Sequence, residues 1–178
     1  MNRFLFGILA LIPALLCGQG LKLDALDKLA ARASESVTVN LDASLLKLAS
    51  KFLSSNEPDE IQVKKIVAGL RGVYVRNFEF AKTGQYQESD VEAIRSQLRD
   101  AKWKHVVEIR SRNSTADVCL RQEGDNITGL TLISAEPLEL TVVYIDGPID
   151  MDGLAKLSGN FGIPEGIKSK IEKEKKSK

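Results

Sequence analysis

The sequence predicts a two-layer α+β domain, in which helices pack on a mainly antiparallel sheet of five or six strands. Four β-rich segments follow one another between Trp103 and Ile145, separated by turn residues and with no room for helices. Such spacing is typical of an antiparallel meander. Amphipathic helical patterns precede this run and need a sheet on which to bury their apolar sides. The length of 178 residues suits one full-sized core, so we expect a single domain over residues 21–164.

Residues 1–20 have the pattern of a secretory signal peptide. A basic residue, Arg3, precedes an apolar stretch from Phe4 to Leu16, and small residues follow it. The stretch is well short of the ~20 residues that a membrane-spanning helix needs. We therefore expect an exported protein of the periplasm or cell envelope, cut between Gly20 and Leu21. The alternative is lipidation at Cys17, so a lipid anchor is possible.

The net charge of the expected mature chain does not indicate a particular class of partner. Removing Arg3 leaves 24 basic and 24 acidic residues, and the Lys-rich end at 165–178 holds six Lys against three Glu. Such an end is more typical of a flexible, solvated tail than of a docking site for anionic lipid or nucleic acid. Cys119 would be the only remaining cysteine. We expect it to be a free, small apolar strand residue without redox chemistry.

The N-terminal third predicts a helix, an edge strand and a second helix. Apolar residues recur at helical spacing from Leu23 to Ala33. Alternation over Val37–Leu41 predicts a short edge strand with one side toward the core. Asp42 is a suitable N-cap for a helix over residues 43–55. The broad apolar stripe of that helix comprises Leu45, Leu46, Ala49, Phe52 and Leu53.

A third helix is expected next, with Asn56 as its cap and Pro58 in its first turn. Its buried residues would be Val63, Ile66, Val67 and Leu70, and Gly72 would end it in the left-handed conformation. The strand Val73–Phe80 follows. Its apolar phase shifts midway, which indicates either a bulge near Arg76 or burial on both faces.

A loop over Ala81–Glu88, centred on Gly84, leads to a fourth helix. Ser89 and Glu92 have the spacing of a capping box. The strand before this helix and the strand at Trp103 after it would make a βαβ-like step, with a right-handed crossover if the two strands are parallel. The apolar line of the helix comprises Val91, Ile94, Leu98 and Ala101.

Within the meander, turns are marked by Asn113-Ser114, Gly124-Asp125-Asn126 and Glu136-Pro137. The strand from Thr115 alternates, and we expect its polar side to face water. Its apolar side comprises Ala116, Val118 and Leu120, and its polar side Asp117, Cys119 and Arg121. The segment Leu138–Ile145 is apolar on both sides, which predicts a central strand. Asp150 would then cap a short helix.

The order of parts resembles a bacterial exported family known as domain of unknown function 4252, over roughly residues 45–164. The resemblance is carried by the segments GLRGVYVRNFEF and ITGLTLISAEPLELTVVYIDGPIDMDGL. Its signals are the joint at Gly72 and the closing pattern at Gly147, Ile149, Asp150 and Leu154. The resemblance implies a small envelope protein, often a lipoprotein, and supplies no activity, cofactor or catalytic residue.

Residues that could carry chemistry have simpler interpretations. His105 is the only histidine, and strict alternation places it with Trp103, Val107 and Ile109 as a half-buried sheet residue rather than a catalytic base. One His and one Cys cannot supply a usual zinc site. Asp146, Asp150 and Asp152 lack calcium-loop spacing, and the last two are better placed to stabilise a helix start. We expect no cofactor and no metal.

Five arginines could form a basic stripe across the sheet, but we expect ordinary exposed charges and no nucleic-acid binding. They are Arg71, Arg76, Arg110, Arg112 and Arg121. Phosphate-binding glycine loops and esterase motifs are absent from the sequence.

The resulting expectation is a non-catalytic envelope protein that binds an envelope protein of unknown identity or serves a structural role. The alternative is an envelope hydrolase or small-ligand binder with a carboxylate-based site. For the interaction we look first at Thr38 in the expected edge strand, and at Gly84 and Tyr86 in the loop. A short edge strand can accept another strand, and an exposed Tyr can anchor in a pocket.

Overall fold

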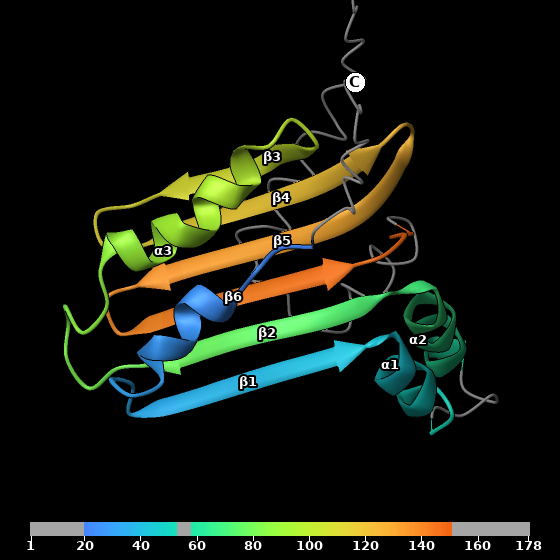
Figure 1. The fold of residues 1–178 in the computed structure, drawn as a ribbon, viewed down its shortest axis with the longest axis horizontal. Helices are drawn as coiled ribbons and strands as arrows, with labels where there is room; N and C mark the ends of the chain where they lie inside the picture. Colours follow the sequence, from blue (N-terminus) through green and yellow to red (C-terminus); the bar gives the residue numbers. More distant parts are fainter. Residues whose placement is uncertain (1–19, 53–57, 151–178) are drawn as a thin grey trace, which may run out of the picture.

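One antiparallel sheet organises the molecule. The computed structural model describes residues 20–52 and 58–150. Its six strands lie in the order β1-β2-β6-β5-β4-β3, and every neighbouring pair is antiparallel (Figure 1). The α+β class with helices on a mainly antiparallel sheet is therefore confirmed. The strands are β1 (Glu35–Asp42), β2 (Gly72–Glu79), β3 (Trp103–Arg110), β4 (Thr115–Glu123), β5 (Asn126–Glu136) and β6 (Glu139–Asp146).

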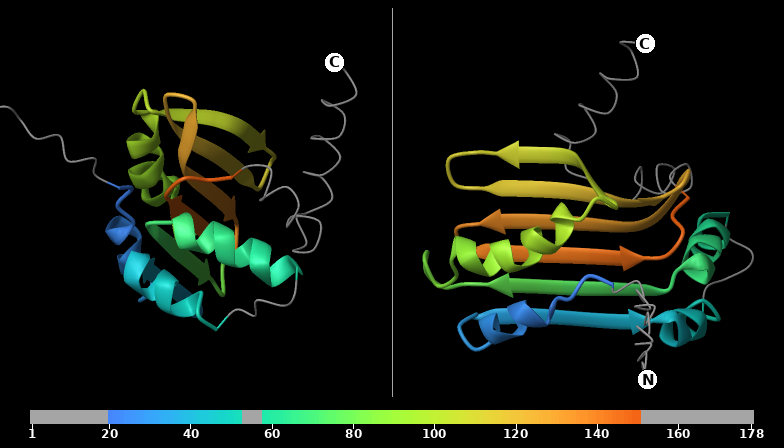
Figure 2. Two further views of the ribbon diagram at one scale, coloured as in Figure 1. Left: turned by 90° about the vertical axis from the view of Figure 1, so that its right-hand side faces the viewer. Right: turned by 45° about the horizontal axis from the view of Figure 1, so that its top comes forward.

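Helical segments cover the sheet unequally. The 3₁₀ helix η1 (Asp24–Leu29), α3 (Glu88–Arg95) and the 3₁₀ helix η2 (Ser96–Arg99) lie across one face, whereas α1 (Ala43–Ala49) and α2 (Pro58–Gly69) lie at one end of the sheet (Figures 1 and 2). The main core lies beneath the first group. Its fully buried residues include Leu26, Leu29, Phe78, Val91, Ile94, Leu98, Ile133, Leu140 and Val142.

The opposite face of the sheet carries a second, smaller cluster under α1 and α2. Leu46 and Leu70 pack there with the strand residues Leu41, Val73 and Ile145. Because successive side chains of a strand point to opposite faces, these strand residues lie on the far side from the main core. The sheet is thus apolar on both faces at this end.

The meander is confirmed as β3–β6, and β6 is central between β2 and β5 as expected. Each neighbouring pair is antiparallel, so β2 and β3 run in the same direction with three strands between them. The connection through α3 therefore crosses the width of the sheet. This is the βαβ-like step that the sequence predicts, but it joins strands that are not neighbours.

The first two helical segments of the described chain are shorter than predicted. The first helix is the short η1, and α1 ends at Ala49 instead of residue 55. Asp42 caps α1 as predicted, because its Oδ1 accepts from the backbone N–H groups of Ser44 and Leu45, each at 2.9 Å. The expected broad stripe is wrong: Leu46 is buried, whereas Phe52 is 83% exposed. The helix sits at the end of the sheet, where only one side meets other residues. Residues 53–57 lie outside the described chain.

Gly72 has a different role from the one expected. It begins β2 and does not adopt a left-handed conformation, and α2 ends at Gly69. A Cβ at Gly72 would lie 2.5 Å from the ring of Tyr74, so glycine allows that ring to cross the backbone closely. The register of β2 is regular on both sides, with no bulge at Arg76. Burial on both faces explains the phase shift.

The N-cap of α3 lies two residues before the predicted position. Gln87 is the cap residue, and its backbone N–H donates to Asp90 Oδ2 at 3.0 Å. Ser89 is exposed within the helix, so the predicted Ser89–Glu92 capping box is wrong. The apolar line through Val91 is confirmed except at Ala101, which is exposed beyond the end of η2.

In β4 the expected orientation is reversed. Asp117 is 1% exposed and Arg121 8%, and both lie with the fully buried Cys119 on the helix-covered face. The apolar residues at 116, 118 and 120 are half-buried on the other face. The strand does alternate, but its polar side is the inner one because it meets charged partners on α3, β3 and β6.

A bulge in β3 corrects the interpretation of His105. The register with β4 shifts between His105 and Val107. One extra residue turns the following side chains over, so Val107 and Ile109 face away from the side that carries Trp103 and His105. His105 is exposed, not half-buried. The predicted leader, the helix after Asp150 and the Lys-rich tail lie outside the described residues.

Candidate functional site

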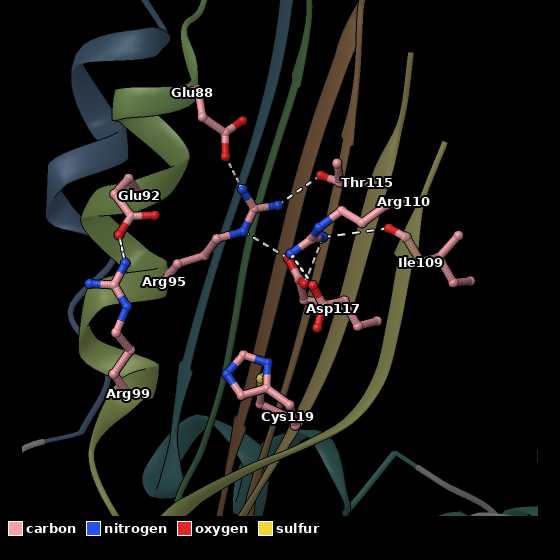
Figure 3. A network of polar contacts seen from close by, with 11 residues as sticks. Glu88, Glu92, Arg95, Arg99, Ile109, Arg110, Thr115, Asp117 and Cys119 are labelled. Carbon is pink, nitrogen blue, oxygen red and sulfur yellow. Dashed lines mark hydrogen bonds and ion pairs between the residues drawn. The ribbon is translucent and has the colours of Figure 1, made fainter. Parts of the chain in front are cut away.

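A layer of ion pairs lies between the helices and the sheet. Its centre is Asp117 on β4, which contacts two guanidinium groups (Figure 3). Arg95 Nε from α3 lies 2.8 Å from Asp117 Oδ2, and Arg110 Nη1 from β3 lies 2.9 Å from Oδ1. Both carboxylate oxygens of a fully buried acid are therefore neutralised. Such a pair is expensive to break, because removing one partner leaves an uncompensated buried charge.

Arg95 connects this layer to the surface. Its Nη2 donates to Thr115 Oγ1 at 2.7 Å, and its Nη1 pairs with Glu88 at the start of α3. Arg110 also pairs with Glu108, at 2.9 Å. The guanidinium of Arg95 thus links the helix to β4 and locks the position of α3 over the β3–β4 half of the sheet.

A second centre forms around Asp146 at the end of β6. Asp146 Oδ1 lies 2.9 Å from Arg71 Nη2 and 2.5 Å from Arg121 Nη2. Burial alone would raise the pKa of Asp146, but hydrogen bonds from the two arginines outweigh it and hold the pKa below its usual range. Arg121 also lies over the ring of Trp103, at 5.7 Å from the centroid.

A third group ties η1 to β1, β2 and α3. Buried Arg76 donates from Nε to Asp27 Oδ1 at 2.7 Å and from Nη1 to Asn40 Oδ1 at 2.8 Å. Buried Asp90 pairs with Lys28 at 2.8 Å. Burial would raise the pKa of Asp90, but the bonds from Lys28 and the Gln87 amide lower it overall. Charged partners of this group are more exposed than those around Asp117.

The sequence did contain a signal for this layer. Asp90 and Arg95 fall on the same helical stripe as Val91, Ile94 and Leu98, so two charged residues occupy buried positions of α3. Buried charges need partners. The polar side of β4 supplies one for Arg95, and Lys28 of η1 supplies one for Asp90. Two of the five arginines expected to be exposed, Arg76 and Arg121, are instead buried. Arg112 is exposed, as expected.

A hollow of about 410 Å³ opens between α3 and β3. It is the natural place for a carboxylate-based site, since Glu88, Glu92 and Glu108 line it. Each of these acids is paired with an arginine: Glu88 with Arg95, Glu92 with Arg99, and Glu108 with Arg110. The acids of the hollow are therefore held in closed ion pairs, and His105 also lines it.

In the lining of this hollow, His105 contacts a cysteine of the neighbouring strand β4. Cys119 Sγ lies 3.4 Å from His105 Nδ1. Burial raises the pKa of the Cys119 thiol to about 11, and the carboxylates of Asp117 and Glu108 act in the same direction. A catalytic thiol needs a lowered pKa, so here the proton stays on sulfur at neutral pH. Cys119 is a free cysteine, as predicted.

A second hollow, of about 490 Å³, lies between η1 and the sheet. The first described residues, Gly20 and Leu21, line it together with Tyr144 and Asp146. Burial raises the pKa of the Tyr144 hydroxyl, and the Asp146 charge adds to this. The two residues predicted to flank the cleavage position thus lie against the folded domain.

The three residues expected to form an interaction site have different surroundings in the structure. Thr38 is exposed in β1, which is an edge strand as predicted. Gly84 has a positive φ of +82°, a conformation that glycine adopts without strain. A Cβ built there would have no atom within 4 Å, so the backbone conformation, and not lack of space, favours glycine in this turn. Tyr86 was expected to be exposed, but it is half-buried, stacks on Phe80 at 5.1 Å and donates to the Glu136 carbonyl at 2.5 Å. It fastens the loop to the sheet.

The free side of β1 can be assigned from the ladder. Phe80 N donates to Leu138 O in line with the β2–β6 register, so even-numbered residues of β2 bond to β6 and odd-numbered ones to β1. The odd-numbered residues of β1 pair with them. The backbone N–H and C=O groups of Ser36, Thr38 and Asn40 therefore point away from the sheet.

Neither a metal site nor a membrane span is found among the described residues. No group of three His, Cys, Asp or Glu side chains is placed to hold a metal within residues 20–52 and 58–150. No helix in these ranges is long and apolar enough to cross a bilayer. Asp146 serves the ion pairs described above, and Asp150 is exposed. Asp152 and Cys17 lie outside the described chain.

Together, the sheet order and the inner ion pairs define a single-sheet α+β domain stabilised by buried charge. A sequence profile of one family, the domain of unknown function DUF4252, matches residues 31–157. The chain therefore belongs to this family, as the segments around Gly72 and Gly147 suggested. No curated protein and no solved structure matches the chain significantly.

Proposed function

We propose that this protein is an exported, non-catalytic interaction module of the cell envelope that binds an extended segment of another envelope protein along β1. The observation that carries the proposal is the free edge of this strand. In the described part of the chain, β1 has a strand neighbour on one side only. Its outward backbone groups at Ser36, Thr38 and Asn40 can form the ladder that an added strand requires.

The composition of β1 supports this role. Glu35 and Asp42 are its only charged residues, and both lie at its ends. No bulge interrupts its register with β2. Natural edge strands that avoid pairing carry charges, proline or bulges, and β1 has none of these in its centre. Val37, which is 43% exposed, and Val39 would contact alternate side chains of a bound segment.

Export supports the envelope as the place of action. The N-terminal 20 residues have the basic start, apolar stretch and small residues of a signal peptide. The resemblance to an exported family points in the same direction. Lipidation at Cys17 would tether the same domain to a membrane without changing the β1 surface.

The alternative, a hydrolase or ligand-binding site in the hollow beside α3, has weaker support. Its acids are held in ion pairs, and the thiol next to it carries a raised pKa. A panel of hydrolase substrates tests this alternative. Reproducible turnover that Glu92→Gln removes would favour the enzyme and contradict the proposed module.

The interaction is tested by capture from envelope extract with three forms of the protein. Thr38→Pro removes an outward N–H without removing a bond to β2, whereas Thr38→Val keeps that N–H and serves as the matched control. We expect one partner to be retained by the native protein and Thr38→Val and to be lost with Thr38→Pro. Equal thermal unfolding of the three proteins would show that the fold is intact. Retention by Thr38→Pro would contradict the proposal.

A further inference from the structure

The hollow of about 490 Å³ under η1 contains the beginning of the described chain. Gly20, Leu21 and Lys22 line it on one side, and Tyr144 and Asp146 line it on the other. Backbone of the chain start and polar groups of β6 therefore share one cavity. This arrangement is independent of the β1 edge.

Two hydrogen bonds and one buried side chain fix residues 21–23 in this place. Lys22 N donates to Gln97 Oε1 at 2.9 Å, and Gln97 Nε2 donates to Lys22 O at 3.0 Å. The side chain of Leu23 is buried in the main core, and Leu21 packs against the same core. The position of the Leu21 nitrogen is thereby set by the residues that follow it.

The Leu21 nitrogen meets acceptors in the cavity. Its backbone amide is within hydrogen-bonding reach of the Tyr144 hydroxyl. A Cβ built on Gly20 would be in ordinary van der Waals contact with the same oxygen, at 3.4 Å, so residue 20 also lies beside Tyr144. Asp24 also lines the cavity, and its carboxylate forms no hydrogen bond or ion pair with any described residue. An amide offers one N–H to these groups, whereas an ammonium offers three.

We propose that this cavity is the seat of the mature N-terminus, created by hydrolysis between Gly20 and Leu21. A membrane-bound endopeptidase of the export machinery would break the Gly20–Leu21 C–N bond. The hydroxyl of water goes to the carbonyl carbon of Gly20, and its proton goes to the Leu21 nitrogen. The new Gly20 carboxyl group then releases its proton, and the Leu21 amine takes up one proton to become an ammonium. The resulting α-ammonium lies against the Tyr144 hydroxyl in a cavity lined by the Asp24 and Asp146 carboxylates. The inference rests on the proposed export and names its cleavage position.

The position of the cut is measured on the full chain, exported with its own leader by a bacterial host. Intact mass of the protein recovered from the cell envelope gives the first residue. We expect a chain that begins at Leu21 with an unmodified amine. A diacylglyceryl group on Cys17, a retained leader, or a different first residue would overturn the inference.

Protection of the α-amine from chemical labelling tests whether the N-terminus lies in this cavity. The exported protein is treated at neutral pH with 2-pyridinecarboxaldehyde, which reacts with free N-terminal amines. We expect labelling of the folded protein to be at least about tenfold slower than labelling of the denatured one. Gln97→Ala, which removes both bonds to Lys22, should restore most of the labelling rate. Gln122→Ala, whose side chain bonds only within the β4–β5 turn, is the matched control and should not.

Equal labelling of folded and denatured protein would overturn the seat even if the cut lies at Leu21. Substitutions at Thr38 leave both measurements unchanged, because Thr38 does not line this cavity. A failure of the β1 interaction and a failure of the N-terminal seat are therefore seen in separate experiments.

Discussion

The two outer strands of the sheet, β1 and β3, are built differently. β3 contains a bulge and carries Lys104, Glu108 and Arg110 along its length. β1 is regular and uncharged between its end residues. Bulges and charges prevent the pairing of edges, so the sequence protects one edge and leaves the other open. This difference supports a binding role for β1.

The same contrast extends to the interior behind each edge. Behind β3, a fully buried Asp117 joins α3 to β3 and β4. Near β1, the acid that pairs with Arg76 is Asp27, whose side chain is half exposed. The β3 half is thus held by buried charge, while the β1 half has a weaker attachment. Substitutions in the two halves should differ accordingly.

Asp117→Ala should give the largest loss of stability. It leaves Arg95 buried without its main acid, and we expect the free energy of unfolding to fall by about 3–5 kcal/mol. Asp27→Ala is the comparison in the other half. Because Asp27 is half exposed and Arg76 keeps the Asn40 oxygen and backbone carbonyls as acceptors, we expect about 1 kcal/mol. Urea unfolding of both variants measures the difference, and equal losses would remove this contrast between the halves.

Acid should weaken the ion-pair layer over a defined range. The pKa values of Asp146 and Asp90 are lowered in the folded protein. Their contribution is therefore complete above the unfolded-state pKa near 4 and is lost as pH falls through the lower folded values. We expect unfolding midpoints to decrease from about pH 5 to about pH 2. Asp146→Asn should be less stable at pH 7 and show a shallower decrease, and an unchanged slope would contradict this assignment.

Cys119→Ser, in β4 next to the edge strand β3, should destabilise the protein less than Asp117→Ala does. The site is fully buried, so a hydroxyl there loses apolar contact, although His105 Nδ1 can accept from it. We expect a loss of about 1–2 kcal/mol and no change in oligomeric state. Thermal unfolding and light scattering measure both. A covalent dimer that disappears with the substitution would show that the thiol has a role beyond packing.

Edge substitutions should have the smallest effect on stability. Val37 on β1 and Val106 on β3 are both exposed valines, at 43% and 57%. We expect Val37→Lys and Val106→Lys each to change the free energy of unfolding by less than about 0.5 kcal/mol. Only Val37→Lys should reduce capture of a partner. Loss of capture with Val106→Lys alone would reverse the proposed difference between the edges.

The sheet was predictable because its signals are local. Alternation and turn residues identify β3–β6, and the segment Leu138–Ile145, which is apolar on both sides, identifies a central strand. The inner ion pairs were not predicted, because alternation gives two sides of β4 without saying which is covered. That choice depends on Arg95 and Arg110, which come from other elements. The bulge that reorients the strand after His105 likewise follows from pairing with β4.

At the candidate interaction site, the prediction for β1 is confirmed and the prediction for Tyr86 is wrong, for a similar reason. Position in the chain was enough to identify β1 as an edge strand, since short polar-apolar alternation outside the meander favours one. The environment of Tyr86 could not be read locally, because its ring packs on Phe80 and its hydroxyl bonds to the β5–β6 turn. Contacts between distant segments decide such exposures.

The most direct test of the central claim is site-specific photo-crosslinking in the intact cell envelope. A photoreactive residue is placed at Val37 on β1 or at Val106 on β3, and each is combined with Thr38→Pro or Thr38→Val. Binding along the β1 edge should give one adduct of defined mass from position 37, kept with Thr38→Val and lost with Thr38→Pro, and no such adduct from position 106. An adduct from position 106 alone, or one from position 37 that persists with Thr38→Pro, would contradict binding along the β1 edge.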